Sequence, residues 1–291
     1  MNDYALLDFG DGRRLERFGS KIVDRLCPIV EGVRKENPAI WGMTDFRFVP
    51  DEKYKNSERG RSTPNLPEPW PITVEPIRFE LRGTPFGHVG LFPEQRENWR
   101  RIIEHLGRAS EKRTETLRIL NLFAYTGGSS IAAALAETPS ADTPIEVVHV
   151  DSAKTVVDWA RRNAELNGIS NGIRYVVEDV RKFVGREIKR GNRYDAVILD
   201  PPSYGHGVKG ESWKIFDHLP ELLVNLVSLL NDDPVLFLLT AHTPGLDALR
   251  LGKMLFEAGF PENFHTEYFS MGLEATTGKR LPLGGGIIYS R

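Results

Sequence analysis

The sequence lacks the features that mark secreted, membrane-spanning and zinc-binding proteins. Only one of its 291 residues is a cysteine, Cys27, which excludes an intramolecular disulfide framework and a cysteine-based zinc cluster and fits a reducing compartment. The seven histidines show no metal-ligand spacing. No apolar run is long enough to span a bilayer, and the start at Met1 lacks the basic residues and apolar core of a signal peptide. We therefore expect a cytoplasmic protein that uses neither a membrane nor a metal ion.

An excess of charge of one sign is also missing. The 38 lysines and arginines nearly balance the 40 aspartates and glutamates, and the net charge is -2. This balance excludes the positive electrostatic potential over the whole surface that is typical of many nucleic-acid-binding proteins, but it allows a local basic patch. The chain is long enough for one large domain with an appendage or for two domains, and its oligomeric state stays open.

Short strand and turn signals characterise residues 1–85. Apolar residues flank Asp11-Gly12, a pair typical of a tight hairpin turn. Further strands are predicted at Ala39–Val49 and Thr73–Leu81, separated by a polar, turn-rich linker at Asp51–Pro64. We therefore predict a small β-rich N-terminal domain, which is a candidate substrate-binding module.

Residues 86–96 form a tightly shaped entry into an amphipathic helix. The entry contains two glycines and one proline, and apolar residues then recur at helical spacing from Trp99 to Leu106. Gly107 is predicted to end the helix. This segment suits either a lid over a bound cofactor or a plain connection between a strand and a helix.

The stretch Leu117–Ala136 organises the rest of the chain. An apolar run rich in leucine and isoleucine breaks at Thr126-Gly127-Gly128 and continues as an alanine-rich helix. Glycine lets the backbone approach a ligand closely, and the first helical turn offers N–H groups to a polar or anionic ligand. Nucleotide-like cofactors bind at such corners in doubly wound sheets, although ordinary connections between strands and helices have the same pattern.

Strands and helices alternate after this corner. The alternation predicts an α/β fold with a doubly wound, mainly parallel seven-stranded sheet and helices on both faces. The last two strands have no helix between them, which predicts an antiparallel edge. The predicted strands after Leu117–Leu122 are Ile145–Val150, Ile173–Val177, Tyr194–Leu199, Val235–Leu239, Phe264–Phe269 and Gly286–Tyr289. The predicted helices are one that Ser152 caps and Gly168 ends, then Val180–Lys189, Trp213–Leu230 and Leu246–Ala258.

Acidic residues stand at the ends of three predicted strands. Asp151 follows the second strand, Asp179 the third and Asp200 the fourth. Ligands bind at the carboxyl ends of the strands in open α/β sheets, and an acidic residue after the second strand is placed to accept hydrogen bonds from ribose hydroxyls. A single aspartate there commonly caps a helix instead. Three of them behind a glycine turn favour a ligand site.

The most specific feature is the run Asp200-Pro201-Pro202-Ser203-Tyr204. Two consecutive prolines cannot continue a strand ladder and hold the chain extended, so their carbonyls are expected to lack the usual strand partners. Beside a carboxylate and an aromatic ring they make a slot for a planar group, with Tyr204 stacking on a base. The alternative is a plain turn after a strand.

Together these motifs resemble those of the class I S-adenosylmethionine-dependent methyltransferases. More narrowly, they are similar to the bacterial 23S rRNA large-subunit methyltransferase family that modifies cytosine C5 or guanine N7. The resemblance implies a Rossmann-like methyltransferase domain at residues 86–291 that uses S-adenosyl-L-methionine as its cofactor. The segments that carry it are Gly90–Arg96, Leu120–Gly128, Val150-Asp151-Ser152, Glu178-Asp179-Val180 and Leu199–Tyr204.

The resemblance assigns a role to each strand end. The glycine turn is expected to surround the methionine part of the cofactor, Asp151 to hold the ribose hydroxyls, and Asp179 to flank the adenine. Asp200 is expected to face the methyl group and the incoming base. The implied cofactor-binding residues are Gln95, Arg96, Asn121, Phe123, Tyr125, Thr126, Gly127, Gly128, Asp151, Ser152, Asp179, Val180 and Asp200, and the implied catalytic residues are Asp200, Pro201, Pro202 and Tyr204.

Two departures from the family pattern bear on the methyl acceptor. Cytosine-C5 members use a cysteine nucleophile after the fifth strand, where this chain has Thr240–Thr243. Covalent C5 methylation is therefore not expected, and the Asp200–Tyr204 run is more similar to that of nitrogen-methylating members. His242 is placed either to contact the acceptor or to end the strand as an ordinary polar residue. The family's usual N-terminal RNA-binding module is not evident in Tyr4–Leu81. The prediction that the methyl group goes to a nitrogen of an rRNA base therefore rests on the family resemblance.

Three other functions share parts of this pattern. A nicotinamide-dependent oxidoreductase would need Gly-x-Gly-x-x-Gly in the first turn, which this chain lacks. A non-catalytic RNA-binding protein with a methyltransferase fold would not need Asp151 and Asp200 together. A methyltransferase acting on a small molecule or a protein stays compatible with the slightly negative net charge.

Overall fold

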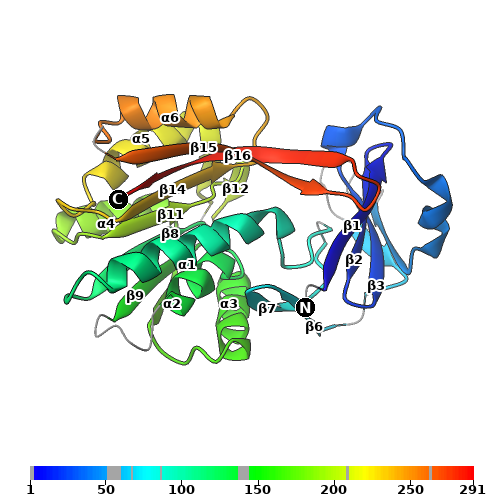
Figure 1. Cartoon of the computed structure of the whole chain (residues 1–291), viewed down its shortest axis with the longest axis horizontal. Coiled ribbons are helices and arrows are strands. Elements are labelled where there is room, and N and C mark those ends of the chain that lie inside the picture. The colour runs from blue at the N-terminus through cyan, green and yellow to red at the C-terminus, as the bar shows by residue number, and fades with distance from the viewer. Residues whose placement is uncertain are drawn as a thin grey trace. The chain divides into compact units, whose positions relative to one another are not determined.

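The chain divides into two compact units (Figure 1). The computed structural model describes residues 3–50, 60–66, 68–85, 87–136, 144–207, 210–261 and 264–291. One unit comprises Met1–Arg96 with Gly272–Pro282, and the other comprises Glu97–Met271 with Leu283–Arg291. The first unit thus extends to Arg96, beyond the predicted N-terminal domain of residues 1–85. The role of residues 1–85 as a substrate-binding module stays a prediction.

The first unit contains a five-stranded sheet and a separate two-stranded hairpin. The predicted turn at Asp11-Gly12 joins the first two strands, and both of its residues have positive φ angles, 52° and 70°, as a tight hairpin turn requires. The strands are β1 (Tyr4–Gly10), β2 (Arg13–Phe18), β3 (Lys21–Leu26), β4 (Phe46–Pro50), β5 (Gly60–Thr63), β6 (Trp70–Val74) and β7 (Ile77–Leu81), and the 3₁₀ helices are η1 (Pro28–Val30), η2 (Pro38–Met43) and η4 (Pro93–Gln95).

Two strand predictions and one linker prediction in this unit need correction. The stretch Ala39–Val49 is not one strand, because a proline opens the 3₁₀ helix η2 before β4 begins. The stretch Thr73–Leu81 is interrupted by a turn at Glu75-Pro76, where the proline favours a reversal of the chain. Of the predicted linker Asp51–Pro64, the first nine residues lie outside the described part, and Gly60–Thr63 forms strand β5.

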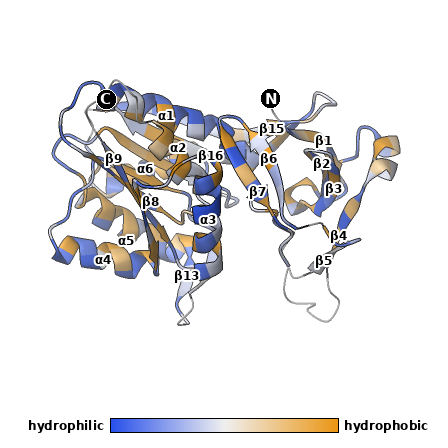
Figure 2. Ribbon diagram, turned by 90° about the horizontal axis from the view of Figure 1, so that it is seen from below, coloured by the Kyte–Doolittle hydropathy of each residue, from blue (hydrophilic) through white to orange (hydrophobic). Residues whose placement is uncertain are grey.

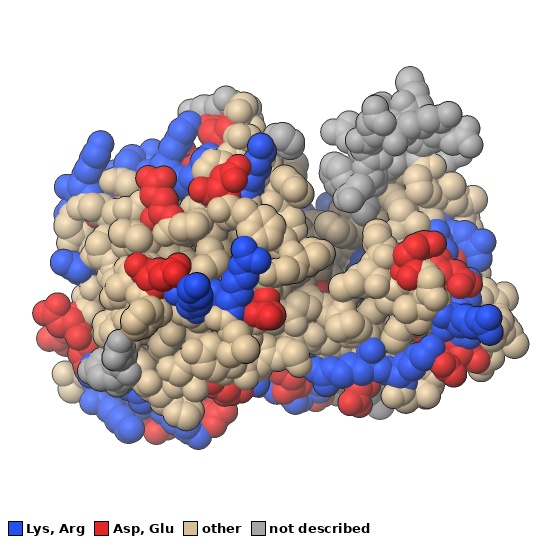
Figure 3. Space-filling model, turned by 90° about the horizontal axis from the view of Figure 1, so that it is seen from above, with Lys and Arg blue, Asp and Glu red and all other residues tan. Residues whose placement is uncertain are grey.

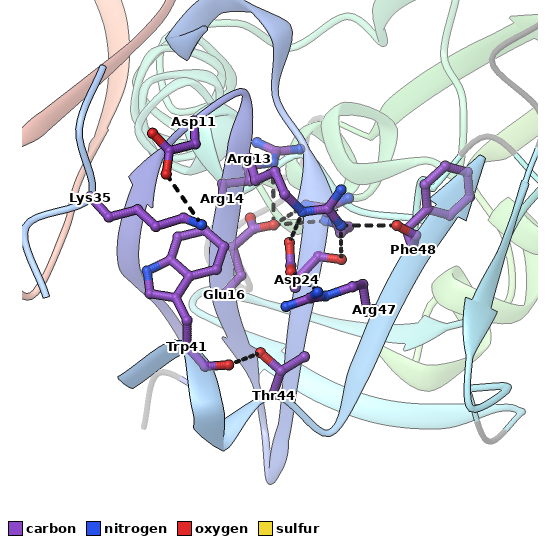
Figure 4. Close-up of polar contacts among 11 residues, drawn as sticks. Asp11, Arg13, Arg14, Glu16, Asp24, Lys35, Trp41, Thr44, Arg47 and Phe48 are labelled. Atoms are coloured by element: carbon purple, nitrogen blue, oxygen red, sulfur yellow. Dashed lines mark hydrogen bonds and ion pairs between the residues drawn. The ribbon is translucent and has the colours of Figure 1, made fainter. Parts of the chain in front are cut away.

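Buried carboxylates in this sheet are neutralised by arginines (Figure 4). Asp24 on β3 is fully buried and pairs with Arg13 and with Arg47, whose Nε lies 2.8 Å from its Oδ2. Glu16 on β2 is also fully buried, and Arg25 Nη2 lies 2.6 Å from its Oε2. A buried charge without its partner would cost several kcal/mol, about 3–5. These charges therefore fix the pairing of neighbouring strands.

The second unit is built on a seven-stranded sheet of order β10-β9-β8-β11-β14-β16-β15. Adjacent strands from β10 to β14 run parallel, and β16 runs antiparallel to β14. The predicted doubly wound, mainly parallel sheet with an antiparallel edge is thereby confirmed. The strands are β8 (Leu117–Leu122), β9 (Ile145–Asp151), β10 (Ile173–Val177), β11 (Ala196–Leu199), β14 (Leu236–Ala241), β15 (His265–Glu274) and β16 (Arg280–Ser290), and a separate hairpin contains β12 (Tyr204–His206) and β13 (Ser212–Lys214).

Helices cover both faces of this sheet (Figure 1). One face packs against α4, α5 and α6 in a single hydrophobic cluster, and the helices α1, α2 and α3 lie over the other face. Each helix carries hydrophobic and hydrophilic residues, as one buried side requires (Figure 2). Within the described ranges no helix is long and apolar enough to cross a membrane. The helices are α1 (Arg96–Ser110), α2 (Gly128–Leu135), α3 (Lys154–Leu166), α4 (Val180–Lys189), α5 (Ile215–Val227) and α6 (Ala248–Glu257).

The predicted bounds of helices α1 and α5 differ most from the structure. Helix α1 continues through Gly107 to Ser110, because glycine in a helix costs only about 1 kcal/mol and packing overrides it. Helix α5 spans Ile215–Val227 rather than Trp213–Leu230, and Trp213 belongs to strand β13. The position of Trp213 matters for the site below.

Candidate active site

Most of the predicted site residues lie at or just after the carboxyl ends of adjacent parallel strands. Leu122 at the end of β8 pairs with Val150 on β9 and with Leu199 on β11, so the three strands end in register. The loops that follow them hold the glycine turn, Asp151 and Asp200. The carboxyl ends of such strands form the usual ligand-binding edge of an open α/β sheet.

The loop after β8 is tightly wound. Phe123 and Tyr125 have φ angles of 53° and 49°, and Gly127, the N-cap of α2, has 93°. A non-glycine residue in this region costs about 1–3 kcal/mol and persists only where its surroundings hold it. The sequence predicts positive φ for glycine alone, and nothing in it signals the two strained aromatic residues.

Neighbouring helices explain why two glycines stand at this turn. A Cβ on Gly127 would lie 3.1 Å from the Cβ of Ala160 on α3, in addition to its left-handed backbone. A Cβ on Gly128 would lie 2.8 Å from a ring carbon of Trp99 on α1. The turn thus packs closely against two helices, which leaves little room for a side chain at either glycine.

Asp151 ties two loops together at the end of β9. Its Oδ2 accepts a hydrogen bond from the backbone N–H of Tyr125 at 3.0 Å, and its Oδ1 accepts one from Ala153 at 3.0 Å. Burial raises the pKa of the Asp151 carboxyl, although the backbone N–H groups of Ala153, Tyr125 and Ser152 oppose the rise. Further donors, such as two adjacent hydroxyls of a sugar, would stabilise the charged form.

Asp200 occupies a polar cluster at the end of β11. Its Oδ1 accepts a hydrogen bond from the Thr240 hydroxyl at 2.7 Å, and its Oδ2 lies 3.3 Å from His242 Nε2. The side chains of Asp200 and His242 are each 30% exposed, so a substrate atom can reach both. Ser203 and Thr243, whose hydroxyls lie 2.7 Å apart, join the same two loops.

The proline slot is only partly as predicted. The Pro202 carbonyl accepts a hydrogen bond from the indole N–H of Trp213 at 2.6 Å, because the β12–β13 hairpin folds back over the loop. This carbonyl therefore has a partner, contrary to the expectation for both prolines. Pro201 is buried, and Tyr204 is 73% exposed. The ring of Tyr204 thus stays available for stacking.

Comparison with known proteins identifies the family. The model of the S-adenosylmethionine-dependent methyltransferases matches residues 39–244, more than half of the chain. The chain belongs to this family. Its predicted family, fold and cofactor, S-adenosylmethionine, are thereby confirmed.

Individual members of the family resemble the chain over different lengths. The crystal structure of a methyltransferase from Agrobacterium tumefaciens has a TM-score of 0.86 and 31% identity, covering 99% of this chain and 90% of that chain. Ribosomal RNA large subunit methyltransferase K of Neisseria meningitidis is 30% identical over 194 residues, 66% of this chain and 51% of the relative. Methyltransferase I of Aeromonas salmonicida is 34% identical over 139 residues, 45% of this chain and 32% of the relative. The chain thus spans about half or less of these two relatives.

Three more predicted cofactor-binding residues of this methyltransferase lie after β9 and β10. Asp179 caps α4, since its carboxylate accepts a hydrogen bond from the Lys182 N–H at 3.1 Å. Val180 packs in the core, 4% exposed, and leaves only its backbone at the start of the helix for an adenine. Ser152 is half-buried beside Asp151. The contacts of these three residues with a cofactor stay predictions.

Gln95 and Arg96 lie in the first unit. Gln95 is buried in η4, and Arg96 begins α1 and donates from Nε to the Glu75 carbonyl at 3.2 Å. Their predicted closure over the methyltransferase cofactor stays a prediction. Among the described residues no group of three or more histidine, cysteine, aspartate or glutamate side chains could hold a metal ion.

Asn121 serves the packing behind the glycine turn. Its side chain is 2% exposed and donates from Nδ2 to the Ser130 hydroxyl oxygen at 2.8 Å. That hydroxyl also lies within hydrogen-bonding distance of the buried imidazole, 3.0 Å from His149 Nδ1. The chain of contacts holds β8, α2 and β9 together. A direct contact of Asn121 with the cofactor stays a prediction.

Two residues that hold the site of this methyltransferase in place are not among those predicted from the sequence. Asn163 on α3 is fully buried and donates to the Thr126 carbonyl at 2.9 Å, which anchors the turn. A polar residue on the otherwise apolar face of this helix is the signal that could have revealed it. Trp213 places its ring 4.8 Å from that of Phe123 and bonds Pro202, so it joins the loops after β8 and β11. No sequence signal reveals that contact.

The buried imidazole of His149 makes the folding stability of the protein depend on pH. Burial and the nearby Arg161 lower the pKa of His149 from its ordinary 6.5 to about 3. The unfolded chain therefore binds a proton below about pH 6.5 that the folded chain refuses, so stability falls as the pH drops toward 3. We expect the melting-temperature advantage of the wild type over His149→Leu to shrink from neutral to acid buffers. An advantage that stays constant would contradict this, and His265→Leu, exposed on β15, is the control.

Proposed function

We propose that this protein transfers a methyl group from S-adenosylmethionine to a nitrogen of a base in RNA. The observation that carries the proposal is the partly exposed Asp200 carboxylate, which follows β11 beside the loop held by Asp151. Relatives named as ribosomal RNA large subunit methyltransferases favour rRNA as the substrate class. The absence of a cysteine after β14 favours a nitrogen over cytosine C5.

Each part of the site has a task in this reaction. The cofactor, when bound, supplies a methyl group activated by its positively charged sulfur. The Asp151 carboxylate holds the ribose, and the backbone of the glycine turn approaches the amino-acid end. The Asp200 carboxylate accepts hydrogen bonds from the incoming base and aligns its nitrogen with the methyl carbon. Such alignment of two bound reactants is the main source of acceleration for a direct transfer.

Charge at the surface argues against recognition by a broad electrostatic field. Lysine and arginine side chains alternate with aspartate and glutamate on the face shown in Figure 3, and the net charge is -2. Stacking and local hydrogen bonds therefore carry more of the recognition of an unpaired base than they do in strongly basic proteins.

The proposal is tested by locating the transferred methyl group. The protein is incubated with S-adenosylmethionine labelled in its methyl group and with an extract whose RNA lacks the modification. The extract is then separated into RNA, protein and metabolite fractions. We expect the label in RNA, in methylated nucleosides stable to nuclease digestion. Label in protein or metabolites alone would exclude RNA as the substrate.

The exposed Tyr204 should contribute to binding of the base. Its ring is 73% exposed, and stacking of one base on an aromatic ring is worth about 1–3 kcal/mol. We expect Tyr204→Ala to lower kcat/KM for RNA roughly 5- to 150-fold, whereas Tyr204→Phe keeps most of the activity. Tyr268→Ala, which removes an exposed tyrosine from β15, serves as the control. Equal losses for the alanine and phenylalanine variants would contradict stacking.

A further inference from the structure

His242 is held between two hydrogen-bond acceptors. Its Nδ1 lies 2.7 Å from the backbone carbonyl of Leu283 on β16, and its Nε2 lies 3.3 Å from Asp200 Oδ2. A carbonyl oxygen can only accept, so Nδ1 carries a hydrogen and donates it to Leu283. In the neutral ring this leaves the lone pair of Nε2 directed at a carboxylate oxygen.

One additional proton would allow His242 and Asp200 to form a strong hydrogen bond. A contact of 3.3 Å is longer than the 2.7–2.9 Å of a charge-assisted hydrogen bond between nitrogen and carboxylate. A proton placed between Nε2 and Oδ2 would convert the contact into such a bond. The other oxygen of Asp200 is engaged by the Thr240 hydroxyl, which fixes the carboxylate in place. The two side chains are therefore arranged to take up a proton as a pair.

We propose that the Asp200–His242 pair accepts the proton released by the methyl acceptor, and that the acceptor is an exocyclic amine of a base. This inference rests on the proposed function. The lone pair of the amine forms the new N–C bond, and the S–C bond breaks with its electrons passing to sulfur, whose positive charge is removed. One proton of the resulting ammonium group passes to Asp200 Oδ2 and on to His242 Nε2. His242 is thus a positioning residue that acts through Asp200.

A ring nitrogen would make no use of this pair. A nitrogen such as guanine N7 carries no hydrogen, so its methylation releases no proton at the reacting atom. The exposure of both side chains, 30% each, lets the amine reach the carboxylate and lets the imidazole return its proton to water. The pair would thereby favour a base nitrogen that releases a proton on methylation over one that does not.

Two substitutions of His242 test the roles of its two ring nitrogens separately. His242→Asn keeps a donor near the Leu283 carbonyl but places no group at the position of Nε2 beside Asp200 Oδ2. His242→Gln places an amide near the position of Nε2, but an amide cannot take up the proton. We expect each variant to lower kcat about 100-fold, at the lower end for general acid–base catalysis, with KM for RNA and affinity for the cofactor unchanged. Added imidazole should restore part of the activity of His242→Gly.

The outcomes distinguish the inference from the proposed function. A wild type that labels no RNA refutes the proposed function. A wild type that labels RNA at a ring nitrogen, identified by mass spectrometry of the nucleosides, overturns the inference alone and needs no variant. Unchanged kcat in both His242→Asn and His242→Gln overturns it as well. His265→Asn, at an exposed histidine of β15, is the matched control and should behave as the wild type.

Discussion

Replacement of Asp200 with asparagine should nearly abolish methyl transfer while the cofactor still binds. The amide keeps the shape of the side chain and can still meet the Thr240 hydroxyl, but it cannot accept a proton from the substrate. Loss of a positioned acid or base typically costs about 10²–10⁴-fold, and we expect a fall in kcat of this size. The measurement is single-turnover transfer of labelled methyl to RNA at saturating cofactor.

Calorimetry supplies the control for that result. The titration of Asp200→Asn with S-adenosylmethionine should give the same affinity as the wild type, because Asp151 and the glycine turn are unchanged. Asp217→Asn, at an exposed position on α5, should leave both transfer and binding intact. Full activity of Asp200→Asn, or a parallel loss of cofactor binding and transfer, would refute the role given to this carboxylate.

Replacement of Asp151 with alanine should have the opposite signature. The substitution removes the carboxylate that would hold the ribose, and it also frees the Tyr125 N–H that fixes the loop after β8. A hydrogen bond to a charged group is worth about 1.5–3 kcal/mol, so we expect cofactor affinity to fall roughly 10- to 150-fold. At saturating cofactor most of kcat should return.

The same calorimetric titration checks this expectation. Asp158→Ala, which removes an exposed carboxylate paired with Lys154 on the neighbouring helix α3, is the matched control and should bind as the wild type does. Affinity unchanged in Asp151→Ala would show that the ribose is held elsewhere. Thermal melting of the variant distinguishes loss of the binding group from a loss of fold.

The second unit could be predicted from the sequence because its pattern is local. Helix α4 and strand β10 have the predicted bounds, since each combines a clear apolar period with an unambiguous stop. In the first unit, prolines at positions 38 and 76 redirect short apolar runs that read as single strands. Short strands with a proline inside give too little periodicity to fix their ends.

The sequence predicts the acidic residues at the strand ends of the site, but not the tertiary contacts that hold its loops in place. Asp151 and Asp200 follow buried strands, so the parallel sheet alone brings them to one edge. The bond from Trp213 to Pro202 depends on a hairpin that returns from the β11 loop, a tertiary contact with no local signal. The strained backbone of Phe123 and Tyr125 likewise depends on the packing around the loop.

A crystal structure of the protein with S-adenosylhomocysteine tests the central claim most directly. The ribose hydroxyls should lie within hydrogen-bonding distance of the Asp151 carboxylate, the amino-acid end against the glycine turn at Gly127, and the sulfur toward Asp200. A ligand bound away from the carboxyl ends of β8 and β9, or one whose sulfur faces away from Asp200, would contradict the account.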